Sequence, residues 1–93
     1  MSYIKYKIPF LFGELFFIKF PPKCKTTIHY HGGKECYYFP LSTRIFEKIF
    51  SNNKCIKIHH LAPYKYYHIN DNIGSHKIIN NNNKNAYSIN YYI

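Results

Sequence analysis

The chain has 93 residues, of which 46% are hydrophobic and 20% aromatic, so global disorder is excluded and one domain over residues 1–93 is expected. Its formal charge is +9, from thirteen Lys and Arg against four Asp and Glu, which favours anionic partners. Because the basic residues are scattered and Arg44 is the only arginine, the sequence argues against a dedicated nucleic-acid surface.

Three cysteines cannot all pair within one chain, and no secretory leader precedes them. The apolar stretch over residues 10–20 is interrupted by Gly13, Glu14 and Lys19 and is too short to span a bilayer. We therefore expect a cytoplasmic protein with reduced thiols and no membrane partner. The sequence leaves the oligomeric state open.

The dominant hydrophobic period along the chain is two, which is typical of strands. A first strand over Leu11–Phe20 is expected to end at the two prolines that follow it. The next elements, in chain order, are strands over Thr26–His31 and Cys36–Phe39, Arg44–Phe50 as a strand or short helix, the alternating Lys54–His60, the tyrosine-rich Tyr64–Ile69 and a last strand over Ala86–Ile93. The Asn-rich run over residues 80–85 is expected to be a solvated loop.

The run from His29 to Cys36 carries the clearest functional signal. His29 and His31 are separated by one residue, so their side chains point the same way from a strand. A third imidazole from a distant strand would complete an open-sided metal site. His68 and His76 are the two candidates for that third position.

Many short strands separated by Gly, Pro and Asn predict an all-β barrel or jelly roll. The spacing of His29, His31 and Glu35 matches the first motif of the cupins, and Pro63 and His68 have the spacing of part of a second one. The sequence therefore predicts a small cupin-type jelly-roll barrel (double-stranded β-helix), which could be incomplete.

Three segments, in the right order, resemble the cysteine dioxygenase family. The first is Ile28-His29-Tyr30-His31 followed by Cys36, and the second is Tyr67–Asn80, which contains Ile73-Gly74-Ser75-His76. The third is the tail Ala86–Tyr92. The resemblance covers about residues 15–93, and relative to the family the chain looks shortened at both ends.

The resemblance implies an Fe(2+) ion held by three histidines, and oxidation of free cysteine or a similar small thiol by O2 to a sulfinate, a step of cysteine catabolism. It implies that Cys36 and Tyr92 are the catalytic pair that the family can join by a thioether bond. It also implies that Lys5 contacts the substrate carboxylate, where the family has an arginine. The residues that it assigns to the metal are His29, His31 and His76.

Several alternatives stay open at this point. Glu35 could be a fourth ligand, as in other cupins, and His68 could replace His76. Asn90 stands where the family has a histidine that supports the active-site tyrosine, so this polar contact is in doubt. His59 and His60 would point to opposite faces of an extended strand and receive no role.

A different chemistry also fits the first motif. Cys24, His29, His31 and Cys36 form a symmetrical set that would satisfy tetrahedral zinc, and such a closed site would be structural. The alternative functions are therefore a non-enzymatic or structural-zinc β-domain, or a basic module that binds nucleic acid.

Overall fold

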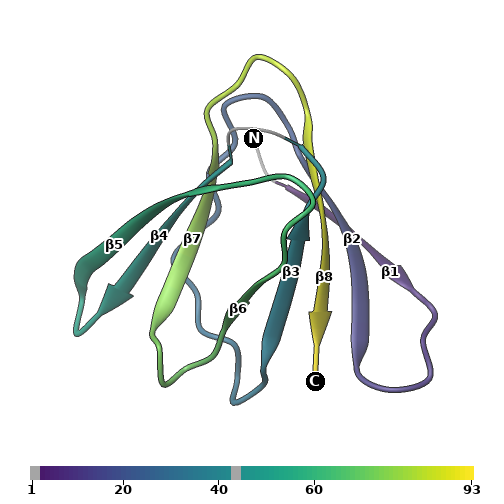
Figure 1. Cartoon of the computed structure of the whole chain (residues 1–93), viewed down its shortest axis with the longest axis horizontal. Coiled ribbons are helices and arrows are strands. Elements are labelled where there is room, and N and C mark those ends of the chain that lie inside the picture. The colour runs from purple at the N-terminus through teal and green to yellow at the C-terminus, as the bar shows by residue number, and fades with distance from the viewer. Residues whose placement is uncertain (1–2, 43–44) are drawn as a thin grey trace.

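The computed structural model describes residues 3–42 and 45–93, in which eight strands form two antiparallel sheets (Figure 1). The first sheet, in the order β1-β2-β8-β3-β6, contains β1 (Ile4–Ile8), β2 (Glu14–Phe20), β8 (Ala86–Tyr92), β3 (Cys36–Pro40) and β6 (Tyr67–Ile69). The second sheet, in the order β5-β4-β7, contains β5 (Lys54–Leu61), β4 (Ile45–Ser51) and β7 (Ser75–Asn80). The all-β prediction is confirmed. Within the described residues no helix is long and apolar enough to cross a membrane.

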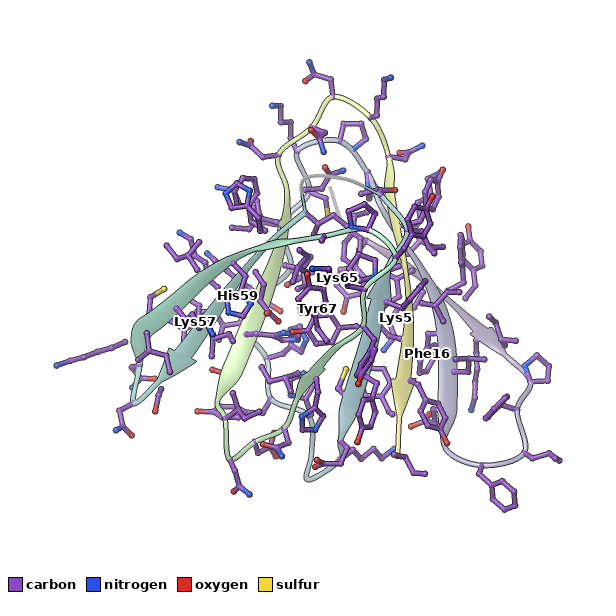
Figure 2. The ribbon with its side chains drawn as sticks, in the orientation of Figure 1. Lys5, Phe16, Lys57, His59, Lys65 and Tyr67 are labelled. Atoms are coloured by element: carbon purple, nitrogen blue, oxygen red, sulfur yellow. The ribbon has the colours of Figure 1, made fainter. Side chains whose placement is uncertain are left out.

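The two sheets face each other and their inward side chains fill the space between them (Figure 2). Strand β4 shows the alternation that directs side chains inward. Ile45 and Ile49 are buried, while Phe46 and Lys48 between them are half-buried. This alternation is the period of two that the sequence predicted. The other core residues of the sheets are Ile18, Phe20, Cys36, Tyr38, Leu61, Ile69, Ile78 and Ala86.

Most predicted strands are present with shifted ends. Ile45–Ser51 is a strand and not a helix, although Arg44 lies outside the described residues. The tyrosine-rich segment forms a strand only over Tyr67–Ile69, and the last strand ends at Tyr92. Strands β1 and β7 were not predicted.

The first predicted strand was too long at its start. Leu11 and Phe12 belong to the turn between β1 and β2, and the strand begins only at Glu14. Gly13 makes this turn possible, because its φ is +70° and a Cβ atom there would lie 2.5 Å from the Tyr92 carbonyl oxygen.

The predicted strand over Thr26–His31 is not continuous. The segment runs antiparallel to β7, where Thr26 N donates to the Ile78 carbonyl at 2.9 Å. The Ile78 N–H, however, donates to the Thr26 hydroxyl at 2.9 Å. A side-chain oxygen thus takes the place of a ladder carbonyl, and two isolated bridges remain, Lys25 with Ile79 and His29 with His76.

Asn80 was wrongly predicted to lie in a solvated loop. Its side chain is fully buried at the end of β7, where Nδ2 lies 3.0 Å from the Phe20 and Pro21 carbonyls and 2.9 Å from the Lys84 carbonyl. Its Oδ1 accepts a hydrogen bond from Asn82 N at 3.1 Å. Asn80 therefore joins the end of β2 to the loop that precedes β8.

We expect Asn80→Ala to lower the free energy of unfolding by about 2 kcal/mol or more, because it leaves buried carbonyls without a donor. Urea unfolding measures the difference. Asn83→Ala is the matched control, since Asn83 is exposed in the same loop and its loss should cost less than about 0.5 kcal/mol. Equal losses in the two variants would contradict the role given to Asn80.

Candidate metal centre

The backbone brings His29 and His76 directly opposite each other. His29 N donates to His76 O at 2.9 Å, and His76 N donates to His29 O at 3.1 Å. Residues paired in this way across an antiparallel bridge project their side chains to the same side. The chain then turns at His31, whose N–H donates to Asp71 Oδ1 at 2.7 Å, while Gly33 N donates to the other carboxylate oxygen at 2.8 Å.

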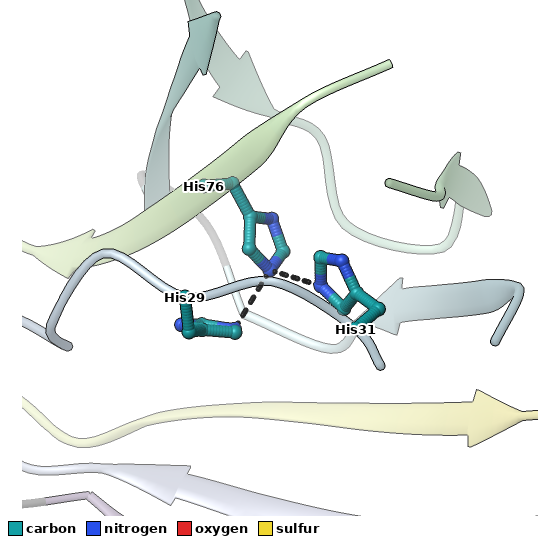
Figure 3. A group of neighbouring side chains, drawn as sticks. All are labelled: His29, His31 and His76. Carbon is teal, nitrogen blue, oxygen red and sulfur yellow. Dashed lines mark hydrogen bonds between the residues drawn. The ribbon is translucent and has the colours of Figure 1, made fainter. Parts of the chain in front are cut away.

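These contacts bring the three imidazoles together (Figure 3). The Nε2 atom of His76 lies 3.0 Å from Nε2 of His29 and 3.0 Å from Nε2 of His31. His31 is 7% exposed and His76 is 2% exposed. Within residues 3–42 and 45–93, these histidines are the group whose metal-binding atoms all lie within 4.8 Å of one another, and they could hold a metal ion.

The hydrogen bonds of the Nδ1 atoms of His29 and His76 determine whether the Nε2 atoms, which face the centre of the cluster, carry a proton. His29 Nδ1 lies 2.9 Å from the Thr27 carbonyl, and His76 Nδ1 lies 2.7 Å from Glu47 Oε2. Since a carbonyl and a carboxylate only accept, each Nδ1 donates, and a neutral ring is left with a bare Nε2. Two bare nitrogens 3.0 Å apart repel unless a cation lies between them. The donor set therefore fits a metal ion.

The electrostatics of the cluster also favour the neutral rings that a metal requires. Burial lowers the pKa of His29. Burial, followed by the neighbouring rings of His76 and His29, lowers the pKa of His31 to about 4. At neutral pH both rings have a lone pair to offer.

Glu47 supports the cluster from the core. It is fully buried, and its Oε2 accepts hydrogen bonds from His76 Nδ1 and from the Tyr38 hydroxyl. Burial, followed by the charge of Glu47, raises the pKa of Tyr38, so this phenol keeps its proton and donates it. His59, labelled in Figure 2, brings Nδ1 to 3.4 Å from Glu47 Oε1.

Sequence analysis did not predict that Glu47 and Tyr38 support the cluster, or that His59 lies next to Glu47. A signal for Glu47 was available, because it occupies an inward-facing position between Ile45 and Ile49. A carboxylate at such a position needs buried hydrogen-bond donors, which is a mark of a functional or metal-supporting group.

The predicted pair of Cys36 and Tyr92 lies beside the cluster. The two residues are register partners on β3 and β8. Burial raises the pKa of Cys36 to about 12 and also raises that of Tyr92. The centroid of the Tyr92 ring is 6.4 Å from that of the His31 ring, and the Asn90 side chain accepts a hydrogen bond from the Ser88 hydroxyl at 2.7 Å.

A cavity of about 350 Å³ adjoins the histidines. Lys5 lies in its lining with Nζ 4.1 Å from the centroid of the Phe16 ring and 5.2 Å from that of Tyr92 (Figure 2). The predicted substrate-binding cation and the three histidines therefore share one cavity. Its lining includes His29, His31, His76, Lys5, Phe16, Tyr92 and Asn90.

The alternative ligands lie elsewhere. Glu35 Oε1 lies 2.8 Å from His68 Nε2 and 3.1 Å from Asn70 Nδ2, so Glu35 and His68 are bonded to each other outside the histidine cluster. Neither Cys24, which is packed in the core, nor Cys36 belongs to the cluster. The tetrahedral zinc set considered from the sequence is therefore not formed.

Comparison with known proteins bears on the fold. Neither a protein-family model nor a curated protein matches the sequence. Among solved structures, a cupin domain from Bordetella pertussis Tohama I has a TM-score of 0.75 at 16% identity, over 97% of this chain and 91% of that one. The chain has the cupin fold.

Two more structures share this cupin fold. An uncharacterized conserved protein with a double-stranded β-helix domain, from Klebsiella pneumoniae, has a TM-score of 0.80 at 10% identity, over 98% of this chain and 76% of that one. An oxalate oxidase has a TM-score of 0.71 at 15% identity, over 85% of this chain and 40% of that one. At these identities the likeness concerns the fold, which thus agrees with the sequence prediction.

We expect Glu47→Gln to weaken metal binding by about tenfold, because the ring of His76 loses a charged partner at Nδ1. Competition with a chromophoric chelator, using Fe(II) or Co(II), measures the affinity. Glu35→Gln is the matched control, since that carboxylate is also bonded to a histidine but lies outside the cluster. If Glu47→Gln binds metal as tightly as the unmodified chain, Glu47 does not support the site.

Proposed function

We propose that this cupin is an iron-dependent dioxygenase that oxidises the thiol of free cysteine, or of a similar small thiol, to a sulfinate. The observation that carries the proposal is the convergence of three imidazoles, with the Nε2 atoms of His29 and His31 each 3.0 Å from that of His76, on a cavity that also contains Lys5 and Tyr92. Imidazole is a ligand that suits iron. When bound, the iron would supply the redox chemistry that adds both atoms of O2 to the thiol sulfur.

The cavity residues provide the contacts that a small amino-acid thiol needs. The ammonium group of Lys5 would bind the substrate carboxylate, and the aromatic faces of Phe16 and Tyr92 hold that ammonium in place. A volume of about 350 Å³ admits a small molecule. Lys5 offers charge but not the bidentate fork of an arginine, so carboxylate binding should be weaker than with arginine.

Tyr92 and Cys36 would support the reaction without holding the metal. Tyr92 keeps its hydroxyl proton because its pKa is raised, so it can donate a hydrogen bond to a group in the cavity. The Cys36 thiol, with its pKa raised to about 12, stays protonated beside Tyr92 and does not compete with the substrate thiolate.

The direct test is anaerobic reconstitution with Fe(II), followed by exposure to O2 and cysteine and by measurement of sulfinate. We expect His31→Ala to lose both the iron and the product, and Cys36→Ser to keep the iron with slower turnover. His60→Ala is the control, because that ring packs on Phe46 away from the cluster. A fully active His31→Ala chain, or an iron-loaded chain that makes no sulfinate, would overturn the proposal.

A second test concerns the substrate contact. Lys5→Ala should raise the KM for cysteine by about fivefold and leave that for cysteamine, which has no carboxylate, nearly unchanged. Lys7→Ala is the control, because the Lys7 ammonium is 3.7 Å from Glu14 and is not in the cavity lining. Equal changes for both thiols would remove Lys5 from the binding site.

A further inference from the structure

The turn between β1 and β2 lies at one end of the first sheet (Figure 1). It presents three consecutive apolar side chains to solvent. In this turn, which we call the β1–β2 tip (residues 9–13), Phe10 is 58% exposed, Leu11 is 91% exposed and Phe12 is 73% exposed. Single exposed apolar residues are ordinary on a protein surface, but a contiguous group of large ones marks an interaction site.

The tip is held by its surroundings and is not a loose end. The Tyr91 hydroxyl donates to the Phe12 carbonyl at 2.8 Å, and the Phe10 ring packs edge-on against Tyr91 at 5.5 Å between ring centroids. Gly13 fixes the end of the turn through its left-handed φ. These contacts hold the backbone of the tip in place, while the side chain of Leu11 stays almost entirely in water.

Basic groups flank the tip on β1 and on a neighbouring turn. Lys7 comes from β1 and is exposed. Glu14, the acidic residue at the start of β2, is ion-paired with both Lys7 and Lys34. Positive charge is therefore in excess around the apolar residues, in a chain whose formal charge is +9.

We propose that the β1–β2 tip inserts into the surface of an anionic lipid bilayer. Phe and Leu side chains would enter the boundary between headgroups and acyl chains, and Lys7 and Lys34 would contact the anionic headgroups. A bilayer fits the tip better than a protein partner does, because the three side chains project from a protruding turn and a fluid surface adapts to them. Sequence analysis predicted no membrane partner because the apolar stretch over residues 10–20 is too short to cross a bilayer. Insertion of side chains into the bilayer surface does not require a membrane-spanning segment.

Vesicle sedimentation at low ionic strength tests the proposal. We expect the chain to sediment with vesicles of phosphatidylcholine and phosphatidylserine and not with phosphatidylcholine alone. Leu11→Asp should weaken this binding at least about tenfold, since it removes an inserted side chain and adds a negative charge. Ile58→Asp is the matched control, because Ile58 is 59% exposed on β5 of the other sheet and receives the same change of charge. It should bind nearly as well as the unmodified chain.

A fluorescence measurement separates insertion from simple adsorption. The chain contains no tryptophan, so Leu11→Trp and Ile58→Trp each introduce a single reporter. On addition of the anionic vesicles, the emission of Leu11→Trp should shift to the blue and that of Ile58→Trp should not. No vesicle binding, equal losses in the two Asp variants, or an unshifted Leu11→Trp emission would each overturn the proposal. Loss of a protein complex in Leu11→Asp, without vesicle binding by the unmodified chain, would show instead that the tip docks to protein.

Discussion

The pair of backbone hydrogen bonds between His29 and His76 sets the geometry on which the candidate site depends. It places two imidazoles on one side of a single bridge, although 46 residues lie between them in the sequence. Asp71 then holds the turn that carries His31 back toward them. Once the rings are placed, the Thr27 carbonyl and the Glu47 carboxylate decide which nitrogen of His29 and His76 faces the centre. Ring position and ring tautomer are thus set by different parts of the chain.

The core and the site share residues, so stability and function are linked in this fold. Glu47 lies in an apolar strand, where a buried carboxylate is costly unless donors satisfy it. Tyr38 from the opposite sheet and His76 from the neighbouring strand provide those donors. The same hydrogen bonds that offset the burial of Glu47 also orient a metal-binding ring. The site thus supplies the two hydrogen bonds to Glu47 Oε2 that offset part of the cost of burying a carboxylate in a small domain.

Local patterns in the sequence predicted much of the site and failed where distant contacts decide. The period of two predicted that His29 and His31 lie on one side, and the rings do lie together, although a turn held by Asp71 and not a continuous strand brings them there. The resemblance supplied His76, Cys36 and Tyr92. Thr26 interrupts its strand because its hydroxyl competes with a backbone carbonyl, a choice that depends on Ile78 across the bridge. Asn80 looks like its neighbours in an Asn-rich run, and only the carbonyls of Phe20 and Pro21 distinguish it. Strand β1 was missed because this edge strand is exposed along most of its length. Glu47 could have been found, since a lone carboxylate in an inward-facing row is visible in the sequence.

The excess of positive charge would give the binding of a divalent cation and the binding of an anion at the histidine site opposite dependences on ionic strength. Of the few acidic residues, Glu47 is buried, and Glu14 and Glu35 are paired with Lys34 and His68. A divalent cation approaching the histidines meets a long-range repulsion, whereas an anionic solute is drawn inward. Dissolved electrolyte screens both effects over a distance of about 10 Å at 0.1 M. Association of the cation would accelerate as salt is added, and capture of an anion would slow down, so a buffer that suits one step hinders the other.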